Sequence, residues 1–167
     1  FTTFAIFLLV KNHELGITVV SAIMLTNNLI TIFTHRLIGN LSDKIGEKVI
    51  LVRTSLLLIF IFTGYAYIEY LPLLIGFYLI DNILFGSSIA LKSYLRKIAP
   101  PEDLTGCLSF GMTANHITAV VIPIVGGLAW NAFGYQATFL AGAGIVFIDM
   151  LFALRLPRHE ETPVPHS

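Results

Sequence analysis

The sequence predicts an all-α membrane protein, a bundle of five complete transmembrane helices and one partial helix. Of its 167 residues, 56% are hydrophobic and only 12% are charged, and the mean hydropathy is +0.83. So few charges cannot cover the surface of a soluble domain of this size. The apolar residues also form runs of ~20, the length that crosses a ~30 Å hydrocarbon core. Runs of this length are rare in the alternative, a soluble bundle of buried helices.

The apolar runs follow one another with short polar breaks. Residues 1–10 are apolar from the first position, which predicts the end of a helix whose upstream part is missing. Complete helices are expected over 17–38, 49–68, 71–94, 106–129 and 136–156. The breaks KNHELG, GNLSDKIGEK, YLP, APPEDLTG and WNAFGY carry turn-forming residues. The helix bundle is therefore expected over 1–156, followed by a polar, Pro-rich tail over 157–167 that is expected to be disordered.

Basic residues collect at one face when the predicted spans alternate in direction. Nine lie at that face: Arg36, Lys44, Lys48, Arg53, Lys92, Arg96, Lys97, Arg155 and Arg158. Only Lys11 lies at the other face, and nine plus one account for all ten Lys and Arg residues. The positive-inside rule then places the loops 39–48 and 95–105, and the C-terminal tail, in the cytoplasm. An aromatic belt is expected near the outer boundary from Tyr65, Tyr67, Tyr70, Trp130 and Tyr135.

Three spans carry a polar pair near their centres. The pairs are Asn27 with Asn28, Asp81 with Asn82, and Asn115 with His116. A polar stripe on a membrane helix has to face protein or water, because hydrocarbon offers no hydrogen-bond partner. The sequence therefore predicts a polar layer at mid-bilayer. The three neutral asparagines Asn27, Asn28 and Asn115 suit either a substrate site or hydrogen bonds between helices.

Asp81 has the largest free-energy cost of membrane insertion in this layer. A charged carboxylate at mid-bilayer costs ~2.5–3.5 kcal/mol on insertion scales. Asp81 is therefore expected to be protonated or to pair with a cation, and His116 is the cation candidate at that depth. Such a pair would hold a proton and couple its movement to a conformational change. The alternative is that both residues only tie helices together, for which polar contacts contribute ~0.6 kcal/mol on average. Asp149 is interpreted as structural, because it lies nearer the basic end of its span.

The break over Gly39–Lys48 reads Gly-x-Leu-x-Asp-Lys-x-Gly-x-Lys, and Gly46 is expected to adopt positive φ where the chain reverses. This pattern between two spans resembles the loop signature of the major facilitator superfamily. The matching residues are Gly39, Leu41, Asp43, Lys44, Gly46 and Lys48. Glu47 departs from the pattern, since the family usually has a basic residue there. PIVGG over Pro123–Gly127 resembles part of an antiporter signature of the superfamily, without its upstream glycines.

The resemblance implies half of a twelve-helix alternating-access transporter. The polar tail favours the C-terminal half, with the partial helix as helix 7 and the last span as helix 12; the N-terminal half is the alternative. The spans with polar pairs would be helices 8, 10 and 11 around a central cavity.

The stretch 92–106 resembles bacterial members, which implies the inner (plasma) membrane. The implied function is proton-coupled secondary transport of a small solute, with the three polar pairs as the site and Gly39, Asp43, Lys44, Gly46 and Lys48 as a conformational loop. The implied partners are substrate, protons, lipid and the missing other half of the chain, with no nucleic acid.

Two other function classes are compared with transport. The sequence contains no His-Glu-x-x-His, no Gly-x-Ser-x-Gly and no Cys/His cluster with ligand spacing. We therefore predict no enzyme activity, no cofactor and no metal site. Haem bridging two helices would need two mid-membrane histidines, and only His116 qualifies. A non-transporting receptor or scaffold stays open, although the polar pairs would then lack a purpose.

Overall fold

The computed structural model describes residues 2–86 and 88–156, with the backbone alone at residues 35, 39, 43 and 89. Every regular element in these ranges is a helix. The helices are α1 (Thr2–His13), α2 (Ile17–Ile45), α3 (Glu47–Tyr67), α4 (Leu71–Phe85), α5 (Ser88–Ile98) and α6 (Pro101–Arg155). Within the described ranges, four stretches are long and apolar enough to cross a membrane: Ile17–Ser42, Glu47–Tyr67, Leu71–Ile98 and Pro101–Arg155. The prediction of an all-α membrane protein is confirmed.

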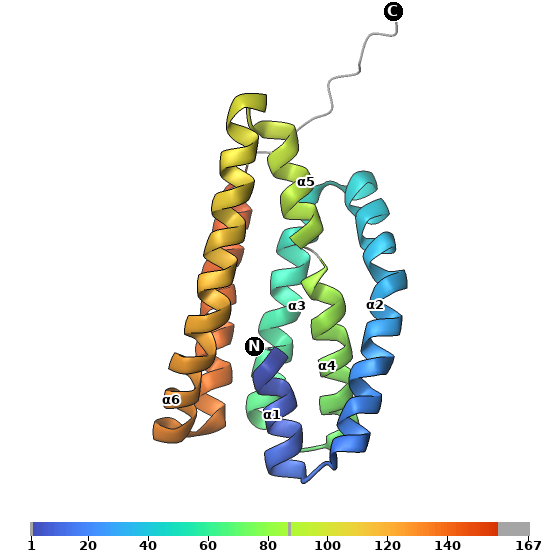
Figure 1. Cartoon of the computed structure of the whole chain (residues 1–167), viewed down its shortest axis with the longest axis vertical. Coiled ribbons are helices and arrows are strands. Elements are labelled where there is room, and N and C mark those ends of the chain that lie inside the picture. The colour runs from blue at the N-terminus through green and yellow to red at the C-terminus, as the bar shows by residue number, and fades with distance from the viewer. Residues whose placement is uncertain (1, 87, 157–167) are drawn as a thin grey trace, which may run out of the picture.

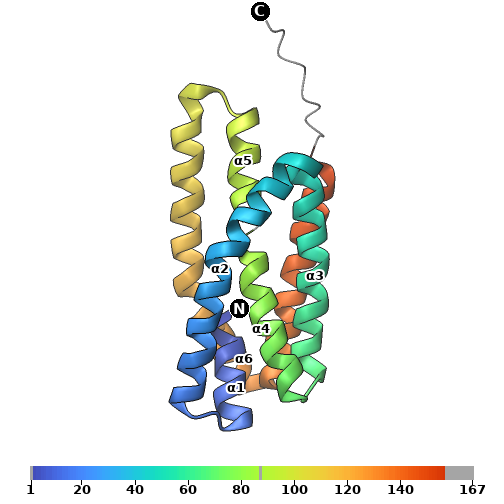
Figure 2. The same cartoon turned by 90° about the vertical axis from the view of Figure 1, so that its right-hand side faces the viewer.

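Helix α6 folds back on itself. Its 55 residues are interrupted at Gly134, which has φ 86° and ψ 171°. Glycine adopts positive φ without a steric penalty, so the chain can reverse there. Figures 1 and 2 show the two antiparallel parts of α6 beside the other helices. We call residues 101–133 the outgoing arm and residues 135–155 the return arm. The outgoing arm contains the span expected over 106–129, and the return arm covers the span expected over 136–156 except its last residue.

The loop expected over 39–48 is helical for most of its length. Helix α2 continues to Ile45, and Gly46 is the one residue between α2 and α3. The sequence between Gly39 and Gly46 contains no proline or glycine that would stop the helix. Gly46 has φ 88° and donates its N–H to the Ser42 carbonyl at 2.9 Å. The loop prediction was therefore wrong for residues 39–45, which continue α2, and for residues 47–48, which begin α3, whereas the positive φ predicted for Gly46 is confirmed.

The helix expected over 71–94 consists of two helices. Helix α4 ends at Phe85, where the Gly86 N–H is bonded to the Ile83 carbonyl at 3.0 Å, and α5 begins at Ser88 and extends to Ile98. Glycine has a low helix propensity, which explains an interruption at this point. The prediction of one continuous helix was wrong, and Asp81 lies four residues before the end of α4.

The apolar core lies where α1, α3, α4 and the return arm of α6 meet. Tyr65 is fully buried, and its ring stacks on Phe139 with centroids 4.9 Å apart. Trp130 is also buried, with its ring 6.1 Å from that of Phe4. Tyr67, in contrast, is 69% exposed. Residues two apart on a helix point to nearly opposite sides, so Tyr65 and Tyr67 cannot share one environment. The aromatic-belt prediction was therefore wrong for Tyr65 and Trp130.

The PIVGG segment brings α1 and α6 into close contact. A Cβ atom at Gly126 would collide with the Phe4 ring. The Thr138 hydroxyl of the return arm donates to the Gly126 carbonyl at 3.4 Å. Both contacts give this segment a packing role.

The basic residues gather at one end of the bundle. Lys44 lies in the last turn of α2, Arg96 and Lys97 in the last turn of α5, and Arg155 in the last turn of α6. Figures 1 and 2 show that these three helix ends lie at the same end of the molecule. We call it the basic end. Lys11 lies in the last turn of α1, at the opposite end. Arg158 and the tail over 157–167 lie outside the described residues.

Candidate transport site within the bundle

Asp81 occupies the interior of the bundle. Its side chain is only 5% exposed, and the Thr2 hydroxyl of α1 donates to its Oδ2 atom at 3.5 Å. This distance is at the long limit for an O–H···O bond, so the contact is weak. Its neighbour Asn82 donates its side-chain N–H to the Tyr78 backbone carbonyl at 2.8 Å, within α4. Asp81 is thus a buried carboxylate with one weak described partner.

Two tyrosines complete the surroundings of Asp81. Tyr65 of α3 and Tyr78 of α4 are buried, and both interact electrostatically with Asp81. The Tyr65 hydroxyl has no hydrogen-bond partner in the described structure. A buried unpaired hydroxyl is uncommon and calls for an explanation. We did not predict Tyr65 as part of the site. The signal for it was the Tyr65-x-Tyr67 spacing, which allows only one of the two rings to face lipid.

The two asparagines of α2 point to different environments. Asn27 is 5% exposed, and its Oδ1 atom has no hydrogen-bond partner among the described residues. Thr31 lies one turn further on the same face, and its hydroxyl also lacks a partner. Asn28 is exposed. Because α2 packs against α4 and α5, Asn27 and Thr31 place unused hydrogen-bonding atoms within the bundle.

A cavity of about 370 Å³ adjoins the buried carboxylate. Its lining residues are Thr2, Thr3, Phe4, Phe85, Asn115, Thr118, Ala119, Ile122, Pro123 and Ile145. Thr2 both lines the cavity and contacts Asp81, whereas Asn115 faces the cavity from the outgoing arm. Thr2 is thus beside Asp81 and in the wall of the same cavity that Asn115 lines.

The Asp81–His116 pair expected from the sequence is not formed in the structure. His116 is exposed on the outgoing arm and does not line the cavity, whereas the described partner of Asp81 is Thr2. Consecutive helical residues are rotated by ~100°, so His116 turns aside when Asn115 faces the cavity. The prediction of this pair was wrong, because it rested only on the depth of the two residues in the membrane. Depth does not specify the helix face on which a residue lies.

The α2–α3 junction carries an ion pair at the basic end, in which the carboxylate is buried and the lysine is partly exposed. Glu47, the first residue of α3, is 5% exposed, and the Lys97 Nζ atom of α5 lies 2.7 Å from its Oε1 atom. The Ser93 hydroxyl donates to the same oxygen at 3.3 Å. The Lys48 Nζ atom donates to the Leu156 carbonyl at 2.6 Å, whereas Lys44 is exposed. Glu47, the residue that departs from the loop pattern, thus connects α3 to α5.

Residues 39 and 43 of this junction are described only as helical backbone. The side-chain position of Asp43 and the contacts at Gly39, both in the expected conformational loop, therefore lie outside the described residues.

Replacing Lys97 with Met should destabilise the protein by leaving the Glu47 carboxylate buried and unpaired. Removing one partner of a fully buried ion pair costs ~3–5 kcal/mol, whereas replacing both by apolar residues is often neutral. Because the Lys97 side chain is 33% exposed, the cost here should lie below that range. We expect Lys97→Met to lower the midpoint of thermal unfolding in detergent by several degrees, and Glu47→Met with Lys97→Met to recover most of the loss. A double variant as unstable as the single one would contradict the pairing.

Asp149 connects the return arm to α3. The Ser55 hydroxyl donates to its Oδ2 atom at 3.0 Å. This interhelical bond supports the structural interpretation of Asp149. Among the described residues, no group of three or more His, Cys, Asp or Glu side chains is arranged to hold a metal ion.

These features define an integral membrane protein with a helical bundle and a polar site in its interior. The sequence pattern of the Major Facilitator Superfamily matches residues 1–167. The chain belongs to this superfamily, whose members are membrane transporters.

The chain is also similar to two curated proteins. Both bear the name "Multi-drug resistance efflux pump PmrA", from Streptococcus pneumoniae serotype 4 (strain ATCC BAA-334 / TIGR4) and from Streptococcus pneumoniae (strain ATCC BAA-255 / R6). Each is 25% identical over 129 residues, which cover 75% of this chain and 32% of the relative. The chain thus spans about a third of the length of these relatives. No solved structure matches it.

Proposed function

We propose that the chain is the C-terminal half of a secondary transporter that moves a small solute by alternating access and couples this movement to protons. The observation that carries the proposal is Asp81, a carboxylate buried in an apolar span, held by one 3.5 Å contact and adjoining a cavity of about 370 Å³. An ionisable residue in a membrane span is costly, and such residues commonly mark ion or substrate paths. A weakly held carboxylate is also free to exchange its proton when the cavity opens.

In this proposal the polar side chains have separate roles. Asp81 binds and releases the proton, and Asn115 binds substrate from the cavity wall. Asn82 and Asn27 supply further hydrogen bonds; the unpartnered Asn27 Oδ1 atom supports such a role. Asn28 and His116 are exposed in this half. They would contact substrate or the other half of the full transporter.

The exposed outgoing arm supports the presence of a second half. All of its residues from 109 to 121 are exposed, although the arm belongs to a membrane-crossing stretch. Among them are the polar residues Thr113, Asn115 and His116, and polar side chains within a membrane require protein or water as neighbours. We propose that the missing half covers this arm.

The basic end then faces the cytoplasm of a bacterial inner membrane. The α2–α3 junction sets the balance between inward- and outward-open states, through Gly39, Asp43, Lys44, Gly46 and Lys48.

The proposal is tested with the full-length protein reconstituted in lipid vesicles. Ligand-induced thermal shifts first identify solutes that bind, starting with the compound classes exported by multidrug pumps because two relatives bear that name. An imposed pH gradient should then drive movement of a binding solute at least several times faster than in protein-free vesicles. Binding without pH-driven movement would contradict proton coupling, and would favour the receptor or scaffold alternative if no other gradient drove movement.

A further inference from the structure

We propose that a second cavity, at the end of the bundle opposite the basic end, binds a small ligand through a primary ammonium group. The cavity has a volume of about 330 Å³. Its lining residues are Leu8, Asn12, His13, Ile68, Glu69, Leu74 and Tyr135. It shares no lining residue with the cavity beside Asp81, so it is a separate site.

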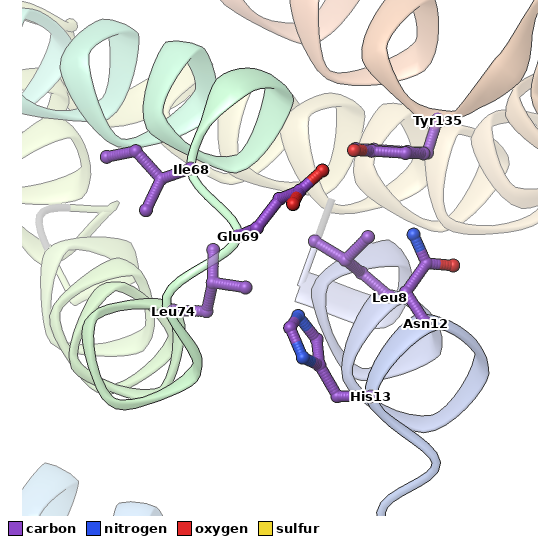
Figure 3. A pocket seen from close by; sticks show the side chains of 7 residues that line it. All are labelled: Leu8, Asn12, His13, Ile68, Glu69, Leu74 and Tyr135. Atoms are coloured by element: carbon purple, nitrogen blue, oxygen red, sulfur yellow. The ribbon is translucent and has the colours of Figure 1, made fainter.

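Three chain reversals bring the polar side chains of this cavity together. Asn12 and His13 lie at the end of α1, Glu69 lies in the link between α3 and α4, and Tyr135 follows the reversal at Gly134. Figure 3 shows the Glu69 carboxylate pointing towards the Tyr135 hydroxyl, with Asn12 and His13 across the cavity on α1. Residues distant in the sequence thus present four polar groups to one space.

The base of the cavity is formed by buried apolar residues. Leu8 and Leu74 are 2% and 0% exposed, and both belong to the hydrophobic core. The Tyr135 ring lies beside Trp130, with centroids 5.9 Å apart. Above these buried residues, a short apolar group of a ligand could contact the partly exposed Ile68 and Tyr135 side chains while its polar end meets the rim, as in most small-molecule sites.

The charges at this cavity favour a cation. Glu69 has no described ion pair or hydrogen bond, so its carboxylate is available to a ligand. Lys11, the lysine at this end of the bundle, does not line the cavity, and its Nζ atom lies 5.3 Å from the Phe7 ring centroid. A primary ammonium group has three N–H donors, and the carboxylate, the Asn12 amide oxygen and the Tyr135 hydroxyl oxygen can accept them. An anionic ligand would instead be repelled by Glu69.

The test measures binding of benzylamine to the full-length protein in phospholipid-free detergent by ligand-observed NMR at pH 8. Glu69→Gln should weaken binding about fivefold, the upper range for an exposed ion pair. The matched variant Glu14→Gln, which removes an exposed acid outside the cavity, should bind like the wild type. Benzyl alcohol, which keeps the ring without the charge, should bind more weakly than benzylamine.

Three results would overturn the proposal: no binding of benzylamine to the wild type, equal affinity of Glu69→Gln and wild type, or equal affinity of benzyl alcohol and benzylamine. Asp81→Asn should leave benzylamine affinity unchanged, so failure at this cavity is distinguishable from failure of the proposed transport site.

The ammonium group has two possible sources, a free amine or the headgroup of phosphatidylethanolamine. Repeating the titration in nanodiscs distinguishes them. The quaternary nitrogen of phosphatidylcholine has no N–H, so only phosphatidylethanolamine can compete with benzylamine for the site. Weaker benzylamine binding in phosphatidylethanolamine than in phosphatidylcholine therefore assigns the site to the headgroup. Equal binding in the two lipids assigns it to a free amine.

Discussion

Replacing Asp81 with Asn should abolish pH-gradient-driven transport by the full-length protein. The amide keeps the size of the side chain and can still accept a hydrogen bond from Thr2, but it cannot bind and release a proton. Removing the ionisable group also removes a mid-membrane cost of ~2.5–3.5 kcal/mol, so folding and expression should be preserved. We expect driven uptake in vesicles to fall to the protein-free background, while exchange of solute without a gradient persists.

Asp149→Asn is the matched control for this experiment. It makes the same chemical change on another membrane-spanning helix, where the carboxylate accepts a bond from Ser55 at 3.0 Å. We expect Asp149→Asn to retain pH-driven transport. Full pH dependence in Asp81→Asn would refute the coupling role of Asp81. Equal loss in both variants would indicate a general effect on the bundle.

Replacing Gly64 with Ala should destabilise the bundle by about 1–3 kcal/mol, the usual cost of inserting atoms into a packed core. A Cβ atom at Gly64 of α3 would collide with the Phe77 ring of α4. This ring cannot move freely, because it packs edge-on against Phe60 and Tyr65 with centroids 6.2 Å and 5.8 Å away. The two helices would therefore have to separate, which also disturbs the packing of Tyr65 beside Asp81.

The comparison variant is Gly76→Ala, on α4, where an added Cβ meets no atom within 4 Å. Alanine has the higher helix propensity, so this variant should be as stable as the wild type or slightly more stable. Both variants are compared by thermal unfolding of the purified full-length protein in detergent. Equal stability of the two variants would show that α3 and α4 do not approach as closely at Gly64 as the structure indicates.

The helical class and the position of Asp81 in a membrane span were predictable, because both follow from local sequence. Apolar length predicts a span, and a carboxylate within it must be buried or hydrated whatever the fold. The reversal at Gly46 was predictable for the same reason, since positive φ is a property of one residue. Helix ends were less predictable: residues 39–45 continue α2, and the one helix expected over 71–94 is two, with α4 ending at Phe85 and α5 beginning at Ser88.

The partners of the polar side chains could not be obtained from sequence. The depth of a residue in the membrane follows from its distance along the helix, at a constant rise per residue. Predicting a contact also requires the rotation of each helix about its axis. Asp81 therefore contacts Thr2, a residue with no signal of its own, whereas His116 points elsewhere. Tyr65 joins the site for the same reason.

By itself, the sequence of this protein determined a basic and a non-basic end, a set of apolar helices and a costly carboxylate within one of them. These properties follow from short stretches of the sequence, and they do not depend on how the helices pack. Only the tertiary structure decided that Glu47 pairs with Lys97, that Asn115 and Thr2 line one cavity, and that Glu69 and Tyr135 line another. Each of these arrangements brings together residues more than 40 positions apart, and the helix rotations that create them depend on the whole core.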